Sequence, residues 1–349
     1  MGLLDKIRRT DDPATMQVTE SVSAAIDRVV ALHPQLRLAR RYQKRLAPAV
    51  AISFAYVRGL VDAVPAPREA SAAAWASDPY IHAYFAAPDD VAALMSRSPD
   101  LRAYFADHGD AAEAYAVLGM ELVERHILGV RLEGETVRRD VPQKTVSFSD
   151  HQVKSCGRTD AELRSAIVRL LLDQLALVGL ARATEDKSRR VALVRERALL
   201  KTRLQLLERQ GKGIGSLIGG DIATELGELA RLQAQVEENA REQAGLGLPE
   251  DALERELEHV RAVFAQPRRH LSVSTRRLTL DRMNVVREPD GIAPATQDGI
   301  DLEFRIARLP TVPPRVRAFS LVRFARANLL PEKNVLEEAE QLLASGLWS

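Results

Sequence analysis

The chain has 349 residues, of which 46% are hydrophobic and 28% charged, with a net charge of +1. This composition excludes an intrinsically disordered chain and is typical of a folded protein large enough for two or more cores. The near-neutral charge gives no overall attraction to nucleic acid or anionic membranes, so binding to either would require a local patch.

The single cysteine, Cys156, excludes an intramolecular disulfide and a cysteine-based zinc cluster, and fits a reducing compartment. Residues 1–9 lack the apolar core of a signal peptide. No stretch approaches the roughly 20 apolar residues of a membrane-spanning helix. We therefore expect a cytoplasmic protein without a transmembrane segment.

The first third of the chain has the apolar spacing of helices. We expect one helix at 18–32, a second from about 36 that breaks or kinks at Pro48, and a third through 52–61, before a proline-rich linker at 64–67.

Between 71 and 129 the sequence predicts short helices. Asp78-Pro79, Pro88-Asp89-Asp90 and Ser98-Pro99 each resemble a helix start, with Asp or Ser as the cap and Pro near the first helical position. The aromatic residues gather here and predict a core, with a partner-binding groove as the alternative: Trp75, Tyr80, Tyr84, Phe85, Tyr104, Phe105 and Tyr115. Residues 111–128 are apolar over a wide face and predict a central helix.

Strands are predicted where the apolar spacing becomes two. The segments are 135–155, 271–286, 302–306 and 316–324. A C-terminal helix from about 332 to 343 is expected to close the chain.

Residues 160–266 have the spacing of two long helical arms that fold back on each other around a glycine-rich tip at 211–220, and the returning arm is interrupted at 245–249. Facing residue 209 with 221 places Leu177 opposite Leu253 and Leu170 opposite Val260. Ordinary bundle helices are the alternative. Only the distal half, 190–209 with 221–240, is expected to project.

The predicted fold class is α+β, predominantly helical, with a long antiparallel helical (coiled-coil) hairpin inserted into an antiparallel β domain. Because such a hairpin brings its ends together, the strands on either side can share one sheet. The predicted parts are a helical region at 1–130 with a sub-boundary near 64–70, first strands at 131–159, the hairpin at 160–266, further strands at 267–328, and a C-terminal helix at 329–349.

The glycine-rich tip departs from phosphate-binding loops. Gly213 stands where Ser or Thr would hold magnesium, and no βαβ unit surrounds the glycines. The tip does carry three apolar residues, Ile214, Leu217 and Ile218, which we predict to bind a protein partner. The alternatives are a simple turn or a shallow membrane contact.

The late strands are rich in arginine. Arg268, Arg269, Arg276, Arg277 and Arg282 could bind nucleic acid or another polyanion. Against this, the aromatic platform for single-stranded RNA is nearly absent. The alternative is that the arginines pair with the acidic segment 250–258.

Two other groups of residues suggest chemistry only weakly. Asp150, His151 and Cys156 are close in sequence but lack any cysteine-enzyme signature. Glu121 and Glu124 are expected to be neighbours on one helix face, but His126 does not lie on that face. We expect no catalytic set, metal or cofactor. The leading hypothesis is a non-enzymatic scaffold or adaptor that acts through a protein partner or self-association. The alternatives are polyanion binding and, more weakly, an enzyme whose site is assembled from distant residues.

Overall fold

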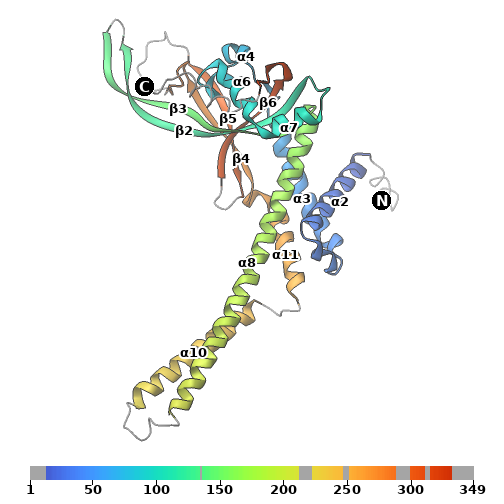
Figure 1. The fold of residues 1–349 in the computed structure, drawn as a ribbon, viewed down its shortest axis with the longest axis vertical. Coiled ribbons are helices and arrows are strands. Elements are labelled where there is room, and N and C mark those ends of the chain that lie inside the picture. The colour runs from blue at the N-terminus through green and yellow to red at the C-terminus, as the bar shows by residue number, and fades with distance from the viewer. Residues whose placement is uncertain are drawn as a thin grey trace, which may run out of the picture. The chain divides into compact units, whose positions relative to one another are not determined.

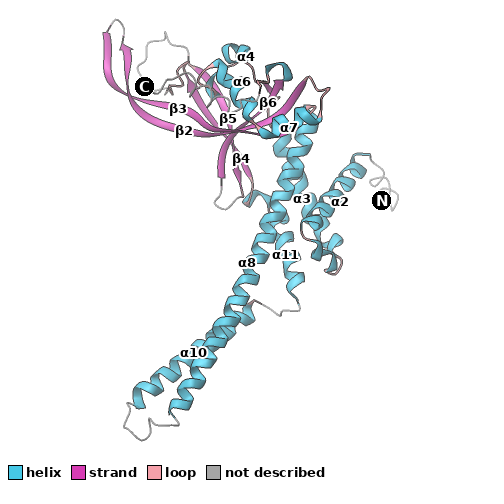
Figure 2. Ribbon diagram, viewed as in Figure 1, coloured by secondary structure: helices cyan, strands magenta, loops and turns pink. Residues whose placement is uncertain are grey.

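A computed structural model describes residues 13–133, 136–211, 222–246, 251–287, 299–310 and 315–331 (Figures 1 and 2). Helices outweigh strands, and the strands form one six-stranded sheet, so the prediction of a mixed, predominantly helical fold is confirmed. The chain divides into unit 1, Met1–Phe54 with Leu172–Pro267, and unit 2, Ala55–Leu171 with Arg268–Ser349. None of the described helices is both long enough and apolar enough to cross a lipid bilayer.

Unit 2 contains the sheet, whose order is β3-β2-β6-β5-β4 with antiparallel neighbours, while β1 pairs in parallel with β6. The strands are β1 (Arg68–Glu69), β2 (Glu113–Glu133), β3 (Thr136–Gly157), β4 (Ser272–Leu280), β5 (Ile300–Leu309) and β6 (Arg315–Ala325). The strands predicted on either side of 160–266 therefore share one sheet, as expected.

The two ends of the sheet are linked by the short segment after β4. The amide of Val146 in β3 donates to Asn284 O at 2.9 Å, and the amide of Val286 donates to Lys144 O at 2.7 Å. On the other side, the amide of Arg287 donates to Thr279 O of β4 at 2.8 Å. Residues 284–287 thus hydrogen-bond to both β3 and β4.

The helix predicted at 111–128 is wrong, because this segment is strand β2. Its buried residues Ala114, Ala116, Leu118 and Met120 alternate at a spacing of two, and they belong to the main core. The residues between them include Val117 and lie on the opposite face of the sheet. Because that face is apolar as well, the segment reads as a nearly continuous apolar run, which periodicity alone does not distinguish from a buried helix.

Four short helices pack against one face of the sheet; the caps predicted for two of them, Asp78 and Ser98, are confirmed, whereas the cap of the helix that starts at Pro88 is Ala87 and not an Asp or Ser. The four helices are α4 (Ala72–Ser77), α5 (Pro79–Tyr84), α6 (Pro88–Arg97) and α7 (Pro99–Asp107). Asp78 accepts from the amide of Tyr80, and Ser98 accepts from that of Leu101. The predicted aromatic core is confirmed in part: Tyr84, Phe85, Tyr104 and Phe105 are buried in one cluster with sheet residues, and Trp75 and Tyr80 pack against it, but Tyr115 is not in the cluster.

The remaining helices are α2 (Pro13–Leu32), α3 (Tyr42–Asp62), α8 (Asp160–Gly211), α10 (Ile222–Gly245) and α11 (Ala252–Ala265), with 3-10 turns η1 (Pro34–Leu38), η3 (Pro267–Arg269) and η4 (Arg326–Asn328). The predicted break at Pro48 is wrong, because α3 continues through it. Pro48 is exposed, so the carbonyl that its missing N–H leaves unbonded, at Lys44, is on the solvent side. The division between the units passes through α3 and α8.

In unit 1, α11 packs on the N-terminal helices and on α8. Ser53 Oγ donates to Phe264 O at 2.6 Å, and His33 Nε2 lies 3.0 Å from Glu256 Oε2. Gly179 of α8 permits close approach, since a Cβ there would come within 2.7 Å of Val260 Cα. At Gly179, α11 therefore packs directly against the backbone of α8.

Two ion pairs between α8 and α10 lie near the predicted register, whereas a contact of α11 departs from it. Arg203 pairs with Glu228 at 2.6 Å and Arg189 with Glu242 at 3.3 Å, each within one residue of the expected partner. By contrast, Val260 lies against Gly179, nine residues along α8 from the expected Leu170. The prediction kept one register across the interruption at 245–249, but α10 ends at Gly245 and α11 begins at Ala252, so the register does not carry across the break. The predicted C-terminal helix from 332 lies outside the described residues.

Candidate partner-binding surface

The three tip residues predicted to bind a partner, Ile214, Leu217 and Ile218, lie outside the described residues. The structure therefore gives no geometry for them. The helices that lead to the tip, α8 and α10, are described up to Gly211 and from Ile222.

The five arginines predicted to bind polyanions do not form one patch. Arg276 and Arg277 are neighbours on β4 and point to opposite faces, where they pair with Glu124 at 2.9 Å and Glu303 at 2.6 Å. Arg268 and Arg269 belong to η3, and the Arg268 guanidinium lies 5.5 Å from the Tyr56 ring centroid. Arg282 is exposed in the turn after β4.

The residues around Cys156 have structural surroundings. Burial raises the pKa of the Cys156 thiol to about 12, so little thiolate forms at neutral pH. His151 stacks on Phe85 with ring centroids 5.2 Å apart, its Nε2 lies 2.8 Å from Tyr84 O, and burial lowers its pKa. Asp150 accepts from Arg317 at 2.7 Å, and this hydrogen bond lowers the pKa of its carboxyl.

Glu121 and Glu124 are not neighbours on one helix face, because they lie on strand β2. A spacing of three residues on a strand directs their side chains to opposite faces. Glu124 pairs with Lys144 at 2.5 Å and with Arg276, and the Lys144 hydrogen bond is the main reason that its pKa is lowered. Nowhere in the described ranges do three His, Cys, Asp or Glu side chains gather so that they could hold a metal ion.

The helix pair α8–α10 has an inner face with an apolar centre and polar edges. Leu193 of α8 and Leu232 of α10 are buried, and so is the polar Asn239, whose Nδ2 donates to Glu196 Oε2 at 3.2 Å. Arg197 Nη1 donates to Gln243 Oε1 at 3.0 Å. These side-chain contacts hold α10 antiparallel beside α8.

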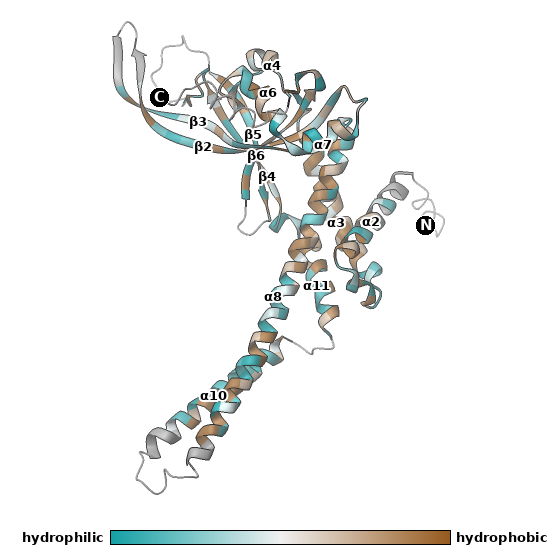
Figure 3. Ribbon diagram, in the orientation of Figure 1, coloured by the Kyte–Doolittle hydropathy of each residue, from teal (hydrophilic) through white to brown (hydrophobic). Residues whose placement is uncertain are grey.

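The opposite side of α8 carries a second apolar stripe, which consists of Val191, Val194, Leu199 and Leu206 and which we call the outer stripe. These side chains are between 44% and 72% exposed. At about 100° per residue, they lie on the side of α8 away from the inner residues Leu193, Leu200 and Leu204. Figure 3 shows apolar and polar residues alternating along α8 and α10.

The charges beside the outer stripe are basic. Arg195 lies within the stripe by helical position, and Lys201 lies at its edge; both are exposed. Two of the acidic residues nearby, Glu196 and Glu228, have partners on the facing helix. The outer face of α8 therefore combines exposed apolar side chains with positive charge.

Sequence reasoning missed the outer stripe because it sought one apolar face per helix. The signal was present in Val191, Val194, Leu199 and Leu206, which are interspersed with the inner residues Leu193, Leu200 and Leu204 in the sequence. No protein-family model matches the chain, and the searches of curated proteins and solved structures found no significant match.

Proposed function

We propose that the chain is a non-enzymatic scaffold or adaptor that presents α8 and α10 to a protein partner as an antiparallel coiled-coil hairpin inserted between the strand regions. The observation that carries the proposal is the outer stripe. Exposed apolar side chains in such a row favour a binding surface, because single surface leucines are common but aligned ones are not. The single Cys156 fits a cytoplasmic location.

The chemistry of the stripe specifies the partner. Val191, Val194, Leu199 and Leu206 fit the apolar side of an amphipathic helix laid along α8. Because Arg195 and Lys201 flank the stripe, that helix should carry Asp or Glu beside its apolar residues. A second copy of α8 would bring these cations against each other, which disfavours self-association through this face alone.

The test measures partner binding after the stripe is made polar. The partner is identified by affinity purification of the full chain from its native cell, and its affinity is then measured with purified proteins. The double variant Leu199→Gln/Leu206→Gln keeps good helix formers and should weaken binding at least about tenfold, since interface anchors are commonly worth 1 to 2 kcal/mol or more.

The matched control adds the same side chains to α10, at the exposed Ala230→Gln/Ala234→Gln. It should bind as the wild type does. Unchanged binding by the stripe variant would exclude this surface. Loss of self-association in sedimentation, instead of loss of a second protein, would identify the partner as another copy.

The glycine-rich tip is tested separately by Ile214→Ser, Leu217→Ser and Ile218→Ser together. In the proposal the tip extends the same partner contact, so this variant should weaken binding while the outer stripe remains intact. If binding survives, the tip is only a turn and the stripe alone recognises the partner.

The alternative proposal is polyanion binding through the arginine-rich region. Exposed Arg268, Arg269 and Arg282 favour it, whereas the carboxylate partners of Arg276 and Arg277 reduce the charge available. It predicts retention on DNA or RNA that falls steeply with salt and with Arg276→Glu/Arg277→Glu. Absence of retention at low salt would exclude it.

A further inference from the structure

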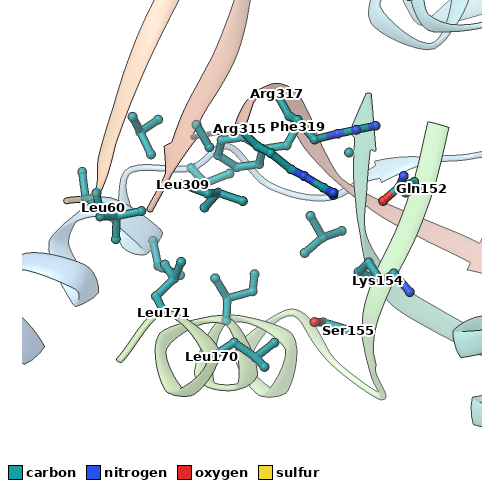
Figure 4. A pocket seen from close by; sticks show the side chains of 18 residues that line it. Leu60, Gln152, Lys154, Ser155, Leu170, Leu171, Leu309, Arg315, Arg317 and Phe319 are labelled. Carbon is teal, nitrogen blue, oxygen red and sulfur yellow. The ribbon is translucent and has the colours of Figure 1, made fainter. Parts of the chain in front are cut away.

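Unit 2 contains a cavity of about 330 Å³ on the face of the sheet opposite the aromatic core (Figure 4). Its floor is made by strand residues that alternate with buried core residues, among them Val117, Phe319 and Leu309. A sheet face that met only water would carry mostly polar residues at these positions. The apolar floor therefore needs a cover.

Two helix ends cover this floor without filling the space above it. Leu60, Val61 and Val64 come from the end of α3 and the turn after it, and Ile167, Leu170 and Leu171 come from the first part of α8. All these residues belong to unit 2. Leu170 is still 52% exposed, which leaves an apolar side chain partly in water beside the cavity.

Arg164 fixes the two helix ends to each other. Its Nη1 donates to Val61 O at 2.6 Å, and its Nη2 donates to Val64 O at 3.0 Å and to Pro65 O at 3.1 Å. Its Nε donates to Asp160 Oδ1 at 2.8 Å. The guanidinium thus caps the end of α3 from α8, and the apolar wall is preformed, as ligand sites usually are.

One end of the cavity is polar and cationic. Gln152, Lys154, Arg315 and Arg317 line it, and the described lining includes no Asp or Glu. Arg317 is held by Asp150 and Lys154 by Asp100, and both carboxylates lie outside the lining. Figure 4 shows the Arg315 guanidinium extending from the strand toward the middle of the ring of side chains.

We propose that this cavity binds a single-chain anionic amphiphile, such as a free fatty acid, with the acyl chain between the sheet and the two helix ends and the carboxylate at Arg315. The volume lies at the lower end of the usual range of roughly 300 to 1,000 Å³ for ligand pockets, which suits one chain. The apolar walls exclude a nucleotide as the better ligand, because they supply few partners for its polar groups. A guanidinium has five N–H donors, so Arg315 can donate hydrogen bonds to a carboxylate in addition to its existing contact.

The test compares three ligands of equal chain length on the full chain by calorimetry: dodecanoic acid, dodecanol and dodecyltrimethylammonium, all below their aggregation concentrations. Dodecanoic acid should bind at least about tenfold more tightly than the other two, since hydrogen bonds to charged groups contribute that much or more. No binding of any ligand, or equal binding of acid and ammonium, would overturn the proposal.

Two variants with matched controls locate the site. Arg315→Ala should remove the preference for the acid, and Arg315→Lys should restore part of it. Replacing the exposed Arg308 of the neighbouring strand β5 by Ala should change nothing.

Gly119→Leu should fill the cavity and weaken binding of the acid and the alcohol at least about tenfold, because packed side chains leave no room for a ligand. A Cβ at Gly119 meets no atom closer than 3.7 Å, so the backbone accepts it.

The control for the filled cavity is Gly59→Leu, at a residue that does not line the cavity and where an added Cβ has no atom within 4 Å. It should bind both ligands as the wild type does. Unchanged affinity in Gly119→Leu, with thermal unfolding showing a folded protein, would overturn the assignment. Binding only to anionic phospholipid vesicles, without binding of dodecanoic acid, would replace the cavity by a membrane-surface contact and would also overturn it.

Discussion

Unit 2 and the α8–α10 pair of unit 1 bury their apolar side chains in different ways. In unit 2, four short helices and a sheet enclose aromatic rings that touch one another, such as Phe148 with Tyr84 at 5.1 Å and with Phe304 at 5.0 Å between centroids. In the α8–α10 pair, two helices can cover only one stripe each. Leu193 and Leu232 are buried there, but Leu199 is 72% exposed.

The difference shows how each region gains stability and how many apolar side chains it leaves exposed for a partner. A layered core removes apolar residues from water on several sides, so few remain at the surface. A two-helix pair leaves most of each helix surface in water, and apolar residues there can serve a partner without weakening the pair. We therefore expect unit 2 to resist opening more strongly than α8–α10.

The largest expected difference is in thiol labelling. At pH 8, Cys156 should react roughly a thousandfold more slowly in the native chain than in urea, because its pKa rises from 9.0 to about 12 on burial. In a Cys156→Ala background, Leu193→Cys should react at least about tenfold faster than native Cys156, since less packed regions open more easily. The measurement is the rate of alkylation followed by mass spectrometry. Equal rates for the two thiols would contradict the comparison.

Truncation of a core side chain should separate the regions next most clearly. Phe304→Ala removes a ring that is 1% exposed and should cost about 3 to 5 kcal/mol of unfolding free energy. Leu232→Ala, at 3% exposed, should cost about 2 kcal/mol, because two helices can close partly around the lost volume. Urea unfolding gives both values. A larger loss for Leu232→Ala would mean that α8–α10 holds the more tightly packed core.

A pH effect should appear in unit 2. Burial lowers the pKa of His151 in the folded state, so the unfolded state binds the proton more readily and stability falls as pH drops through about 6.5, the usual histidine pKa. His151→Gln keeps a donor for Tyr84 O and should flatten this part of the stability profile. The control His126→Gln, exposed on β2, should retain the wild-type profile. Melting temperatures at pH 5.5 and 7.5 provide the measurement.

The sequence was sufficient where the signal is local. Asp78 and Ser98 identify the starts of α5 and α7 because a cap acts within three residues. The alternation along 302–306 identifies β5 because only one of its faces is packed in the core. In β2 the second face is apolar as well, since it forms the floor of the cavity, and the period of two was hidden.

Features that depend on distant residues could not be predicted in the same way. To predict the contact of Gly179 with Val260, one must know how the break in the returning arm shifts the register. The glycines near 245 indicate a break but not the length of the connecting segment. The cavity combines Leu60, Ile167 and Phe319, which are far apart in the chain. Only the order of strands in the sheet brings such residues together.

The smallest expected effect concerns ion pairs. The coupling energy should be larger in unit 2 than between α8 and α10, but the difference is small. The Arg203–Glu228 pair between α8 and α10 is 64% and 41% exposed, so a double-mutant cycle with Arg203→Gln and Glu228→Gln should give about 0.3 kcal/mol. In unit 2, Arg68 and Asp78 are 26% and 22% exposed, and Arg68 also lies 3.6 Å from the Tyr80 ring centroid. Arg68→Met and Asp78→Asn, which keeps a cap for α5, should give about 1 kcal/mol, because less water competes for the pair. A coupling energy at Arg203–Glu228 equal to that at Arg68–Asp78 would show that charge pairs, and not the buried leucines Leu193 and Leu232, hold α10 to α8.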